Sequence, residues 1–432
     1  MTFNLVQTVF ALNMAANAVA GIDDTPQNLQ SLFSAYLNGG PLPSPYGVYE
    51  PNTDTFTTTA PGFFNSLDGS LLGDWEVVWG PAVYVDLAKN MTTGEATNSA
   101  FVAKSVSNNA YVVAIAGTNF KSVEDWLAED VSVDPAQRVA WTDFNPAGLQ
   151  ILTEQEKDNP IRAMIDAGSA LGVSNLVTQL TDPNQQQADM RTLTGFLRQL
   201  PSTDGYLQGS TLYFTGHSLG GALTQVIALY LFAQLEANGW AKIRTLPTAG
   251  PTPGNLGFQM LYDHTFKPGF DPTGFAAVPN WSADVISSGD VVPAAWNNLT
   301  SAFTLNVDQA GNYASFYGEL SPNPIDFKVL WLNFEVKKAP FGKVMGDLML
   351  AITAFVGEFY WPVFQTAFTP TPGFYQRTDG YVTWQPFPLA TDADPILDLK
   401  ALGPYVLHAH TSQYNYYFGI GVVPQFPTVQ GG

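Results

Sequence analysis

Short runs of apolar residues alternate along this chain with longer segments in which apolar positions recur every three to four residues. A short run rich in β-branched and aromatic residues and bounded by turn-forming residues is typical of a β-strand. Apolar positions spaced three to four apart are typical of a helix that buries one face. On these grounds we predict strands at 99–106, 110–116, 210–215, 243–248, 283–288 and 380–385, and helices at 26–37, 188–199, 219–237 and 343–360.

The order of these elements indicates the fold class. Strand and helix alternate around residues 210–248, which favours an α/β fold with a mainly parallel sheet covered by helices. The first two strands are instead predicted to form a hairpin through Asn108 and Asn109. A chain of 432 residues could hold two or three domains, but α/β folds with long insertions often reach this length as one unit. We therefore predict a single domain over residues 1–432.

The segment 344–364 comes nearest to a membrane span. Asp347 and Glu358 interrupt it, so it lacks the run of about 18 uncharged apolar residues that a span requires. Its apolar residues recur at helical spacing, which predicts an amphipathic helix whose apolar face packs on the core or forms the wall of an acyl pocket. No transmembrane segment is predicted.

A G-x-S-x-G motif lies where the strand at 210–215 meets the helix at 219–237. In this motif Gly216 and Gly220 flank Ser218. A serine at such a strand-to-helix turn stands exposed above the sheet, and the tight turn leaves no room for a Cβ on either side. The first N–H groups of the following helix favour an oxyanion nearby. We predict Ser218 as a nucleophile, although the bare pattern also occurs by chance as an ordinary Gly/Ser turn.

A nucleophilic serine requires a histidine base, and the chain has four histidines. His217 is expected to pack beneath the turn, and His264 to lie in a polar loop. His408 and His410 remain, and they would face the same way in an extended segment. Only one of them can be the base. We favour His410, because it adjoins the Ser/aromatic run that ends at Phe418, and we keep His408 as the alternative.

The acid that orients the base is expected at the carboxyl end of a strand, where open α/β sheets carry their chemistry. Asp290 follows the Val/Ile-rich strand at 283–288 and precedes a turn that ends in proline. Asp284 lies at the other end of that strand and is expected to face solvent. We therefore predict Asp290 as the acid; the alternative is that Asp290 only forms the turn.

Four motifs follow one another in the chain, and the two histidines lie downstream of them. The first consists of residues 114–120 together with Asp125, Trp126 and Asp130, and the others are residues 215–223, 249–255 and 289–293. In this order they resemble the class 3 lipases, the fungal-lipase-like branch of the α/β-hydrolases. The segment 215–223 is the most specific of the four. Ala116 departs from the family, which usually has arginine there, and the segments at about 1–95, 150–187 and 300–375 match nothing in it.

The resemblance implies an α/β-hydrolase fold, with a mainly parallel central sheet, helices on both faces and long insertions. One oxyanion donor is expected to be the N–H of Leu219, the residue after the nucleophile. The resemblance implies Thr118 as the second donor. Phe120 and Trp126 share one helical face just beyond it, and are candidates for an amphipathic lid over Ser218 or for the acyl site; the alternative is a surface helix packed on the core.

The composition restricts the partners. Acidic residues outnumber basic ones 37 to 17, and the net charge of −20 argues against nucleic acid and strongly anionic membranes as partners. Hydrophobic residues make up 46%, enough for a large core and a lipid-binding surface. No cysteine is present, so neither disulfides nor thiol chemistry are available. Residues 1–20 lack the basic start of a standard signal peptide, and a soluble protein could be secreted or cytoplasmic.

These observations predict a serine carboxylic-ester hydrolase, with a lipase acting on acylglycerols as the first choice. It would need no cofactor and no metal, and its partner would be a lipid or ester substrate, with an oil–water interface as one possible site of action. A phospholipase A1 or a soluble-ester carboxylesterase would use the same residues. A non-catalytic lipid-binding protein is the alternative of another class, and the complete set of triad residues argues against it.

Overall fold

A computed structural model describes residues 2–50, 55–66, 71–87, 92–117, 138–153, 162–267, 269–270, 280–287, 290, 292–294, 363, 365–368, 374–378, 381–385, 408–420 and 426–429. The predicted helix at 343–360 lies outside these residues, as do Thr118, Phe120 and Trp126.

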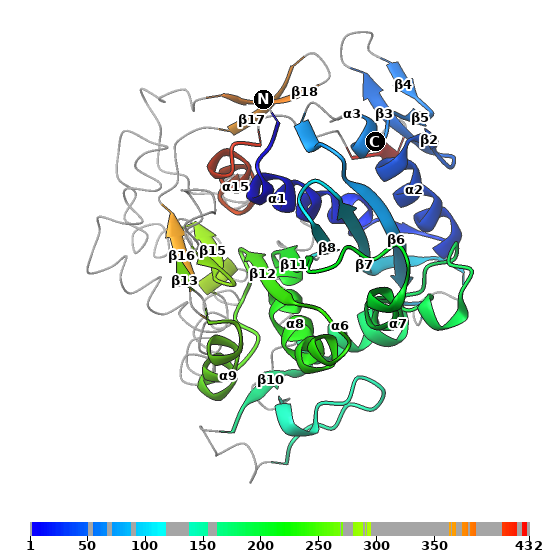
Figure 1. The fold of residues 1–432 in the computed structure, drawn as a ribbon. Helices are drawn as coiled ribbons and strands as arrows, with labels where there is room; N and C mark the ends of the chain where they lie inside the picture. Colours follow the sequence, from blue (N-terminus) through cyan, green and yellow to red (C-terminus); the bar gives the residue numbers. More distant parts are fainter. Residues whose placement is uncertain are drawn as a thin grey trace, which may run out of the picture.

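A mixed sheet forms the centre of the described fold (Figure 1). Its strand order is β1-β7-β8-β11-β12-β15-β16, and β6 pairs with β7. The strands β8, β11, β12, β15 and β16 run parallel, whereas β1 and β6 each pair antiparallel with β7, and β7 with β8. The bounds are β1 (Asp23–Asp24), β6 (Glu76–Val85), β7 (Gly94–Ser105), β8 (Ala110–Ile115), β11 (Thr211–His217), β12 (Lys242–Thr248), β15 (Asp284–Ser287) and β16 (Gln365–Phe368).

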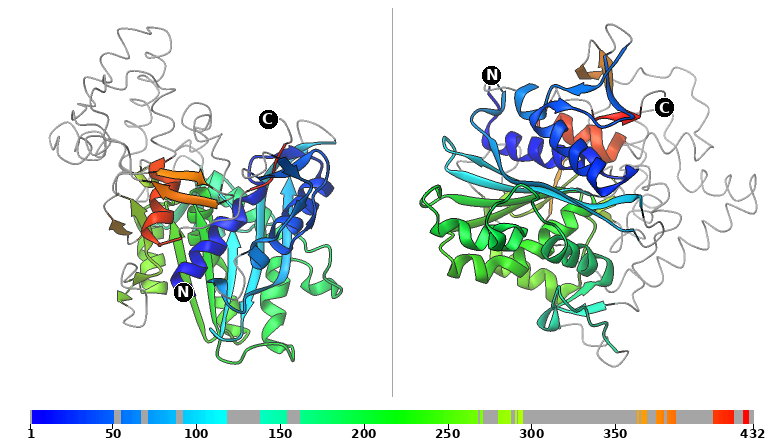
Figure 2. Two further views of the ribbon diagram at one scale, coloured as in Figure 1. Left: turned by 90° about the horizontal axis from the view of Figure 1, so that it is seen from above. Right: turned by 90° about the vertical axis from the view of Figure 1, so that its right-hand side faces the viewer.

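Helices cover both faces of the sheet, as the right-hand view of Figure 2 shows. One face carries α1 (Leu5–Ala15), α2 (Pro26–Asn38) and α15 (Gln413–Tyr417). The other carries α6 (Ala167–Thr178), α7 (Leu193–Gln199), α8 (Leu219–Ala237) and α9 (Leu256–Phe266). A sheet covered on both faces needs strands that are apolar at every position, and all six residues of β8 are buried.

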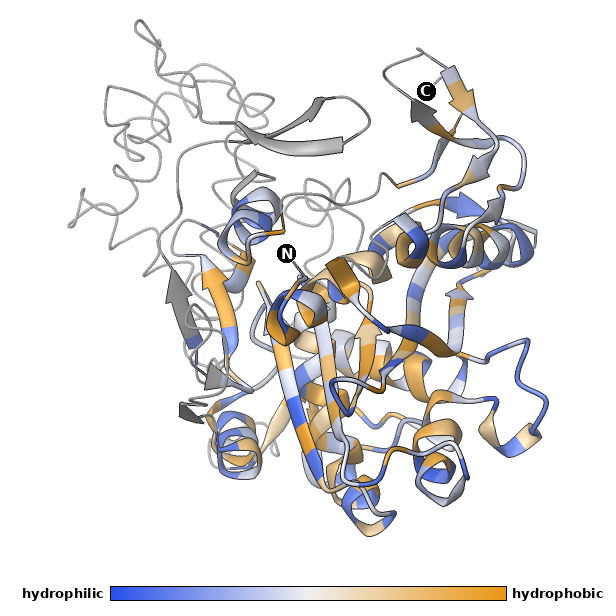
Figure 3. Ribbon diagram, turned by 45° about the horizontal axis from the view of Figure 1, so that its top comes forward, coloured by the Kyte–Doolittle hydropathy of each residue, from blue (hydrophilic) through white to orange (hydrophobic). Residues whose placement is uncertain are grey.

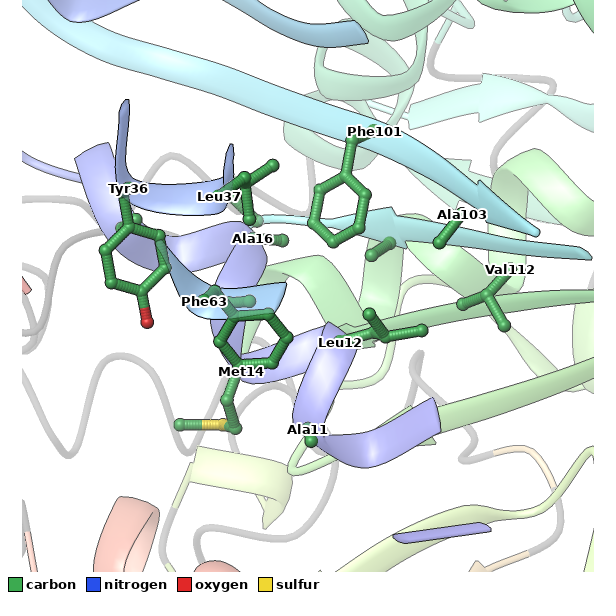
Figure 4. Packing of buried hydrophobic residues seen from close by; sticks show 14 of the residues in the cluster. Ala11, Leu12, Met14, Ala16, Tyr36, Leu37, Phe63, Phe101, Ala103 and Val112 are labelled. Carbon is green, nitrogen blue, oxygen red and sulfur yellow. The ribbon is translucent and has the colours of Figure 1, made fainter. Parts of the chain in front are cut away.

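The alternation of side chains along a strand divides the core into two layers. On β7, Phe101 and Ala103 pack with α1 and α2, while Ala100 and Val102 pack on the opposite face with α6 to α8. Figure 4 shows the first of these layers, with α1 and α2 packed against β7 and β8. Figure 3 shows hydrophobic residues both along the strands of the central sheet and on the helices that cover it.

Short elements surround this framework. The remaining strands are β2 (Gly40–Pro41), β3 (Tyr46–Glu50), β4 (Thr55–Thr57), β5 (Thr59–Ala60), β9 (Arg138–Ala140), β10 (Met164–Asp166), β13 (Gly269–Phe270), β14 (Asn280–Trp281), β17 (Phe374–Thr378), β18 (Tyr381–Gln385) and β19 (Thr428–Val429). The remaining helical turns are η1 (Ala16–Val19), α3 (Phe63–Ser66), η3 (Trp141–Asp143), η4 (Ala188–Met190), η5 (Leu200–Ser202), η6 (Val292–Ala294) and the π-helical turn η7 (His408–Ser412).

The α/β-hydrolase fold and most predicted elements are confirmed. The hairpin is β7–β8, the other strands are β11, β12, β15 and β18, and the helices are α2 and α8. The predicted helix at 188–199 is shorter than expected, because the 3₁₀ turn η4 precedes α7. The pattern misses α1 entirely. Nine of its 11 residues are buried, so no polar face marks a helical period there.

The helix α8 is, among the described residues, long and apolar enough to cross a membrane. About two thirds of its most apolar stretch is buried inside the fold, where it packs on β11 and β12. These features are those of a core helix, and the apolar character of α8 follows from its central position.

Candidate active site

The predicted nucleophile lies at the turn between β11 and α8. Ser218 has φ 59° and ψ −130°, a conformation that an L-residue adopts only when the surrounding structure imposes it. A Cβ on Gly216 would clash with the carbonyl oxygen of Gly220, and a Cβ on Gly220 would lie 2.7 Å from the carbonyl oxygen of Ile115. The two glycines therefore permit the close packing of the turn that holds Ser218 strained.

Leu219 begins α8 directly after Ser218. The first N–H groups of a helix have no acceptor within the helix, and they carry the positive end of its dipole. The carbonyl of Ser218 accepts from the N–H of Gly221 at 2.8 Å, which fixes the start of the helix. The N–H of Leu219 thus belongs to a rigid helix terminus next to the serine.

Asp290 and His410 form a buried pair, although 120 residues separate them in the chain. His410 Nδ1 lies 2.7 Å from Asp290 Oδ2, and both side chains are completely buried. Asp290 Oδ1 also accepts from the N–H of Val292 at 3.0 Å. These contacts orient the imidazole through its Nδ1 edge.

Tyr414 is a third partner of this pair, and sequence reasoning missed it. Its hydroxyl donates to Asp290 Oδ2 at 2.9 Å and accepts from the N–H of Ser287 at 2.9 Å. Burial, reinforced by the nearby Asp290 carboxylate, raises the pKa of Tyr414 well above 10, so the hydroxyl keeps its proton. The signal in the sequence was the spacing of four residues between His410 and Tyr414, about one helical turn.

His217 connects the turn that carries Ser218 to the segment that carries His410. Its Nε2 lies 2.6 Å from the carbonyl oxygen of His410, and its Nδ1 lies 2.9 Å from Thr248 Oγ1. Burial and the adjacent His410 lower the pKa of His217 well below 6.5, so the ring is neutral. Since a carbonyl oxygen only accepts, Nε2 carries the hydrogen and Nδ1 accepts from the hydroxyl of Thr248.

His217 is buried beneath the turn, as expected, but it is more than a packing residue. The centroids of its ring and the His410 ring lie 4.7 Å apart. Since His217 immediately precedes Ser218 in the chain, this contact places the backbone of His410 beside the nucleophile turn.

The turn at Gly117, which the resemblance assigns to the oxyanion hole, also contacts the turn that carries Ser218. Gly117 is buried, and a Cβ on it would clash with the carbonyl oxygen of His217 and lie 3.3 Å from the Cβ of Ser218. Gly117 therefore packs directly on the nucleophile turn. Thr118, the predicted second donor, follows it outside the described residues.

Two expectations about neighbouring residues, those for His264 and Asp284, are wrong. His264 lies exposed in α9 rather than in a loop. His408 and His410 belong to a π-helical turn, so the segment is not extended. Asp284 is 1% exposed rather than facing solvent, because β15 is only four residues long and its first residue already lies inside the sheet.

The carboxyl of Asp284 is an unusual buried group beside this site. Burial raises its pKa to about 8, and the Asp290 carboxylate adds to the effect, whereas bonds from the N–H of Gly250 and the side chain of Gln365 oppose it. The N–H of Gly250 donates to Asp284 Oδ1 at 3.3 Å. Asp284 is therefore protonated at neutral pH.

We expect Asp284→Asn to raise the melting temperature at alkaline pH. An unfolded aspartate ionises near pH 3.9, whereas the folded one holds its proton up to about pH 8. The folded state thus binds more protons in this window, and stability from this group falls as pH rises from about 4 to 8. Asparagine does not ionise, so it removes this loss of stability, and its amide oxygen can still accept from the N–H of Gly250.

Calorimetry at pH 5 and pH 8.5 measures the effect. The melting temperature of the variant minus that of the parent is expected to be larger at pH 8.5 than at pH 5, by at least about 3 °C. The exposed Asp204 supplies the control, since Asp204→Asn should show no such trend. An equal difference at both pH values for Asp284→Asn would contradict the buried neutral carboxyl.

The fold and the strained serine turn define the class, an α/β-hydrolase. Residues 150–299 match the family Lipase (class 3). Among solved structures the chain is similar to M37 lipase, with 22% identity, a TM-score of 0.51 and coverage of 80% of this chain and 79% of that one. It is also similar to the Lip2 lipase of Yarrowia lipolytica (18% identity, TM-score 0.33, 51% and 62% covered) and to a lipase of Rhizopus microsporus var. chinensis (16%, 0.33, 68% and 70%).

No curated protein matched the chain. The likeness to M37 lipase supports the fold. The family match contains the serine turn, and it confirms the resemblance to the class 3 lipases over residues 150–299. The expectation that residues 150–187 match nothing in the family is wrong, since they lie inside this match. The match over residues 150–299 supports an ester hydrolase of the lipase class.

Proposed function

We propose that Ser218, His410 and Asp290 form the catalytic triad of this ester hydrolase. The observation that carries the proposal is the buried bond of 2.7 Å between His410 Nδ1 and Asp290 Oδ2, formed by a histidine whose own carbonyl is bonded to His217 of the serine turn. A base that binds the acid through Nδ1 uses Nε2 to take the proton of the serine hydroxyl, which is the arrangement of a serine hydrolase.

The mechanism assigns one step to each residue. His410 Nε2 takes the hydroxyl proton of Ser218 while Ser218 Oγ attacks the ester carbonyl carbon. The carbonyl oxygen becomes an oxyanion, which the N–H groups of Leu219 and Thr118 stabilise. His410 then returns the proton to the leaving alcohol, and a water molecule activated by the same imidazole hydrolyses the acyl-enzyme.

Asp290 has two functions in this cycle. It holds the imidazole in the tautomer that carries hydrogen on Nδ1, and its charge stabilises the imidazolium that forms after proton transfer. Tyr414 and the N–H of Val292 fix the carboxylate by two further bonds. Because these side chains are buried, each of these interactions is stronger than it would be in water.

We propose acylglycerol esters as the substrates. The family match, the abundance of hydrophobic residues and the net charge of −20 favour a neutral lipid over an anionic one. Phe120 and Trp126 stay predictions for a lid or acyl site. Phospholipase A1 or soluble-ester carboxylesterase activity is the alternative, and a lipid-binding protein without activity is the alternative of another class.

A panel of four substrates tests this proposal. p-Nitrophenyl butyrate, tributyrin, triolein and phosphatidylcholine are assayed side by side with the same enzyme. Hydrolysis of both glycerides supports the lipase, and hydrolysis of phosphatidylcholine alone points to the phospholipase. Hydrolysis of only the soluble ester would make the protein an esterase, and no hydrolysis of any of the four would contradict the triad.

Asp290→Asn is expected to lower kcat by about 10⁴-fold, because the amide favours the wrong imidazole tautomer and carries no charge. The assay is p-nitrophenyl butyrate hydrolysis at saturating substrate. Asp182→Asn is the control, since Asp182 is also buried but bonds to the N–H of Gly80 away from the serine turn. An Asp290→Asn enzyme within tenfold of the parent would assign the acid to another carboxylate.

A further inference from the structure

The helix α1 contacts all three segments that contribute to the proposed site. Gln7, Phe10, Asn13 and Asn17 are spaced by three, three and four residues, which places them along one side of the helix and its 3₁₀ extension η1. The stretch spans about 15 Å at 1.5 Å per residue. Each of these side chains reaches a different part of the active-site framework.

The C-terminal end of this row reaches the turn before Thr118. Asn17 Oδ1 accepts from the N–H of Gly117 at 2.8 Å in a fully buried bond. Asn17 Nδ2 donates to the carbonyl of Asn13 at 3.2 Å, which orients the amide so that its oxygen faces Gly117. Asn17 is 5% exposed.

The middle of the row reaches the serine turn. Asn13 Nδ2 donates to Thr248 Oγ1 at 3.2 Å, and this hydroxyl is the partner of His217 Nδ1. The carbonyl of Thr248 accepts from the N–H of Ser218 at 3.0 Å. Asn13 is therefore linked to the nucleophile turn through one residue.

The N-terminal part of the row holds the helix that follows His410. Gln7 Nε2 donates to the carbonyl of Phe418 at 2.9 Å, and the rings of Phe10 and Phe418 stack with centroids 4.1 Å apart. Phe418 caps α15, the helix that carries Tyr414.

Gly117 needs such an external contact. A side chain is excluded there by the carbonyl oxygen of His217, so the position must be glycine, yet glycine leaves the backbone free to rotate. Its buried N–H also requires an acceptor, and Asn17 provides it. Asn17 thereby fixes the orientation of the Gly117 peptide beside the nucleophile turn.

We propose that α1 with its extension η1 is a positioning element of the active site and that Asn17, in η1, is its decisive residue. Asn17 holds the Gly117 peptide against the nucleophile turn, and thereby maintains the backbone geometry beside Ser218 on which the proposed oxyanion hole depends. This role rests on the proposed triad and oxyanion hole. Asn17 itself touches neither substrate nor the reacting atoms.

Asn17→Leu tests the proposal, since leucine is close to asparagine in size and cannot accept a hydrogen bond. The rate is expected to fall because a misplacement of about 1 Å costs about 100-fold. For p-nitrophenyl butyrate we expect kcat to fall by about 10- to 100-fold while KM changes less than threefold. The Ki of a trifluoromethyl ketone, which forms a tetrahedral adduct with the serine, should rise by the same factor as kcat/KM falls.

The Ki distinguishes positioning from simple destabilisation. A variant that only lowers the folded fraction loses kcat with an unchanged Ki. Ser99→Ala is the matched control: the Ser99 hydroxyl donates to the carbonyl of Ala16, the first residue of η1, at 3.1 Å. The variant therefore loses a buried bond to the same helical turn as Asn17 but keeps the bond between Asn17 and Gly117. It is expected to keep both kcat and Ki.

A folded Asn17→Leu enzyme with the kcat and Ki of Ser99→Ala would overturn the role of α1. Asn17→Ala, which also lacks the acceptor, is measured in the same way if the leucine variant does not fold. Ser218→Ala separates a failure of the triad proposal from a failure of the positioning proposal. If Ser218→Ala keeps activity, the triad itself is wrong. If Ser218→Ala is inactive and Asn17→Leu is unaffected, only the positioning role is rejected.

Discussion

Replacing Ser218 by alanine is expected to lower kcat by about 10⁵- to 10⁶-fold while the protein stays folded. Loss of the nucleophile from a triad removes the acyl-enzyme pathway, and other members of the triad do not compensate for it. Alanine also relieves no packing constraint, because the strain at this position lies in the backbone with its φ of 59°. The fold should therefore survive the change.

Hydrolysis of p-nitrophenyl butyrate measures the loss, and a melting curve reports the fold. Ser210→Ala is the matched control, since Ser210 is a buried serine immediately before β11, at the end opposite Ser218. It should keep kcat within about twofold. A second readout is covalent labelling: a fluorophosphonate should modify the parent and Ser210→Ala but not Ser218→Ala. Labelling of Ser218→Ala at the parental rate would reject Ser218 as the nucleophile.

His410→Ala is expected to match the loss seen for the nucleophile, about 10⁵- to 10⁶-fold in kcat, because base and nucleophile act as a unit. The buried bond between His410 Nδ1 and Asp290 Oδ2 is the reason for choosing this histidine over its neighbour. His408→Ala should keep kcat within about tenfold. The two histidines are two residues apart in one π-helical turn, so they test the assignment within the same local structure.

Both variants are assayed under the same conditions, with saturating substrate and equal amounts of folded protein. The double variant His410→Ala with Ser218→Ala should lose no more than either single variant, because the residues are not independent. An inactive His408→Ala beside an active His410→Ala would transfer the base to His408. It would also show that the bond to Asp290 is structural.

The local features of the site follow from the sequence. Gly216, Ser218 and Gly220 lie within five residues, and the requirement for glycine there is a property of the turn itself. The hairpin through Asn108 and Asn109 and the strand before Asp290 are set in the same way by short-range pattern and turn chemistry. Ser218, Asp290 and the C-terminal histidines could therefore be predicted as candidates.

Other features depend on contacts between distant segments. The contact of His410 with Asp290 is one of them, because the π-helical turn brings His410 to Asp290 across 120 residues of chain. The bonds of His217 to His410 and of Tyr414 to Asp290 have no local pattern that requires them. The sequence alone does not distinguish an extended segment at 408–410 from the π-helical turn that the structure shows.

Periodicity, glycine and proline act over a few residues, so they predict the class of fold, the serine turn and the candidates for base and acid. The burial of α1 in the core and the buried, protonated state of Asp284 depend instead on contacts between distant segments. Burial and pKa depend on which surfaces meet, and α1 meets strands that lie about 100 and 200 residues further along the chain.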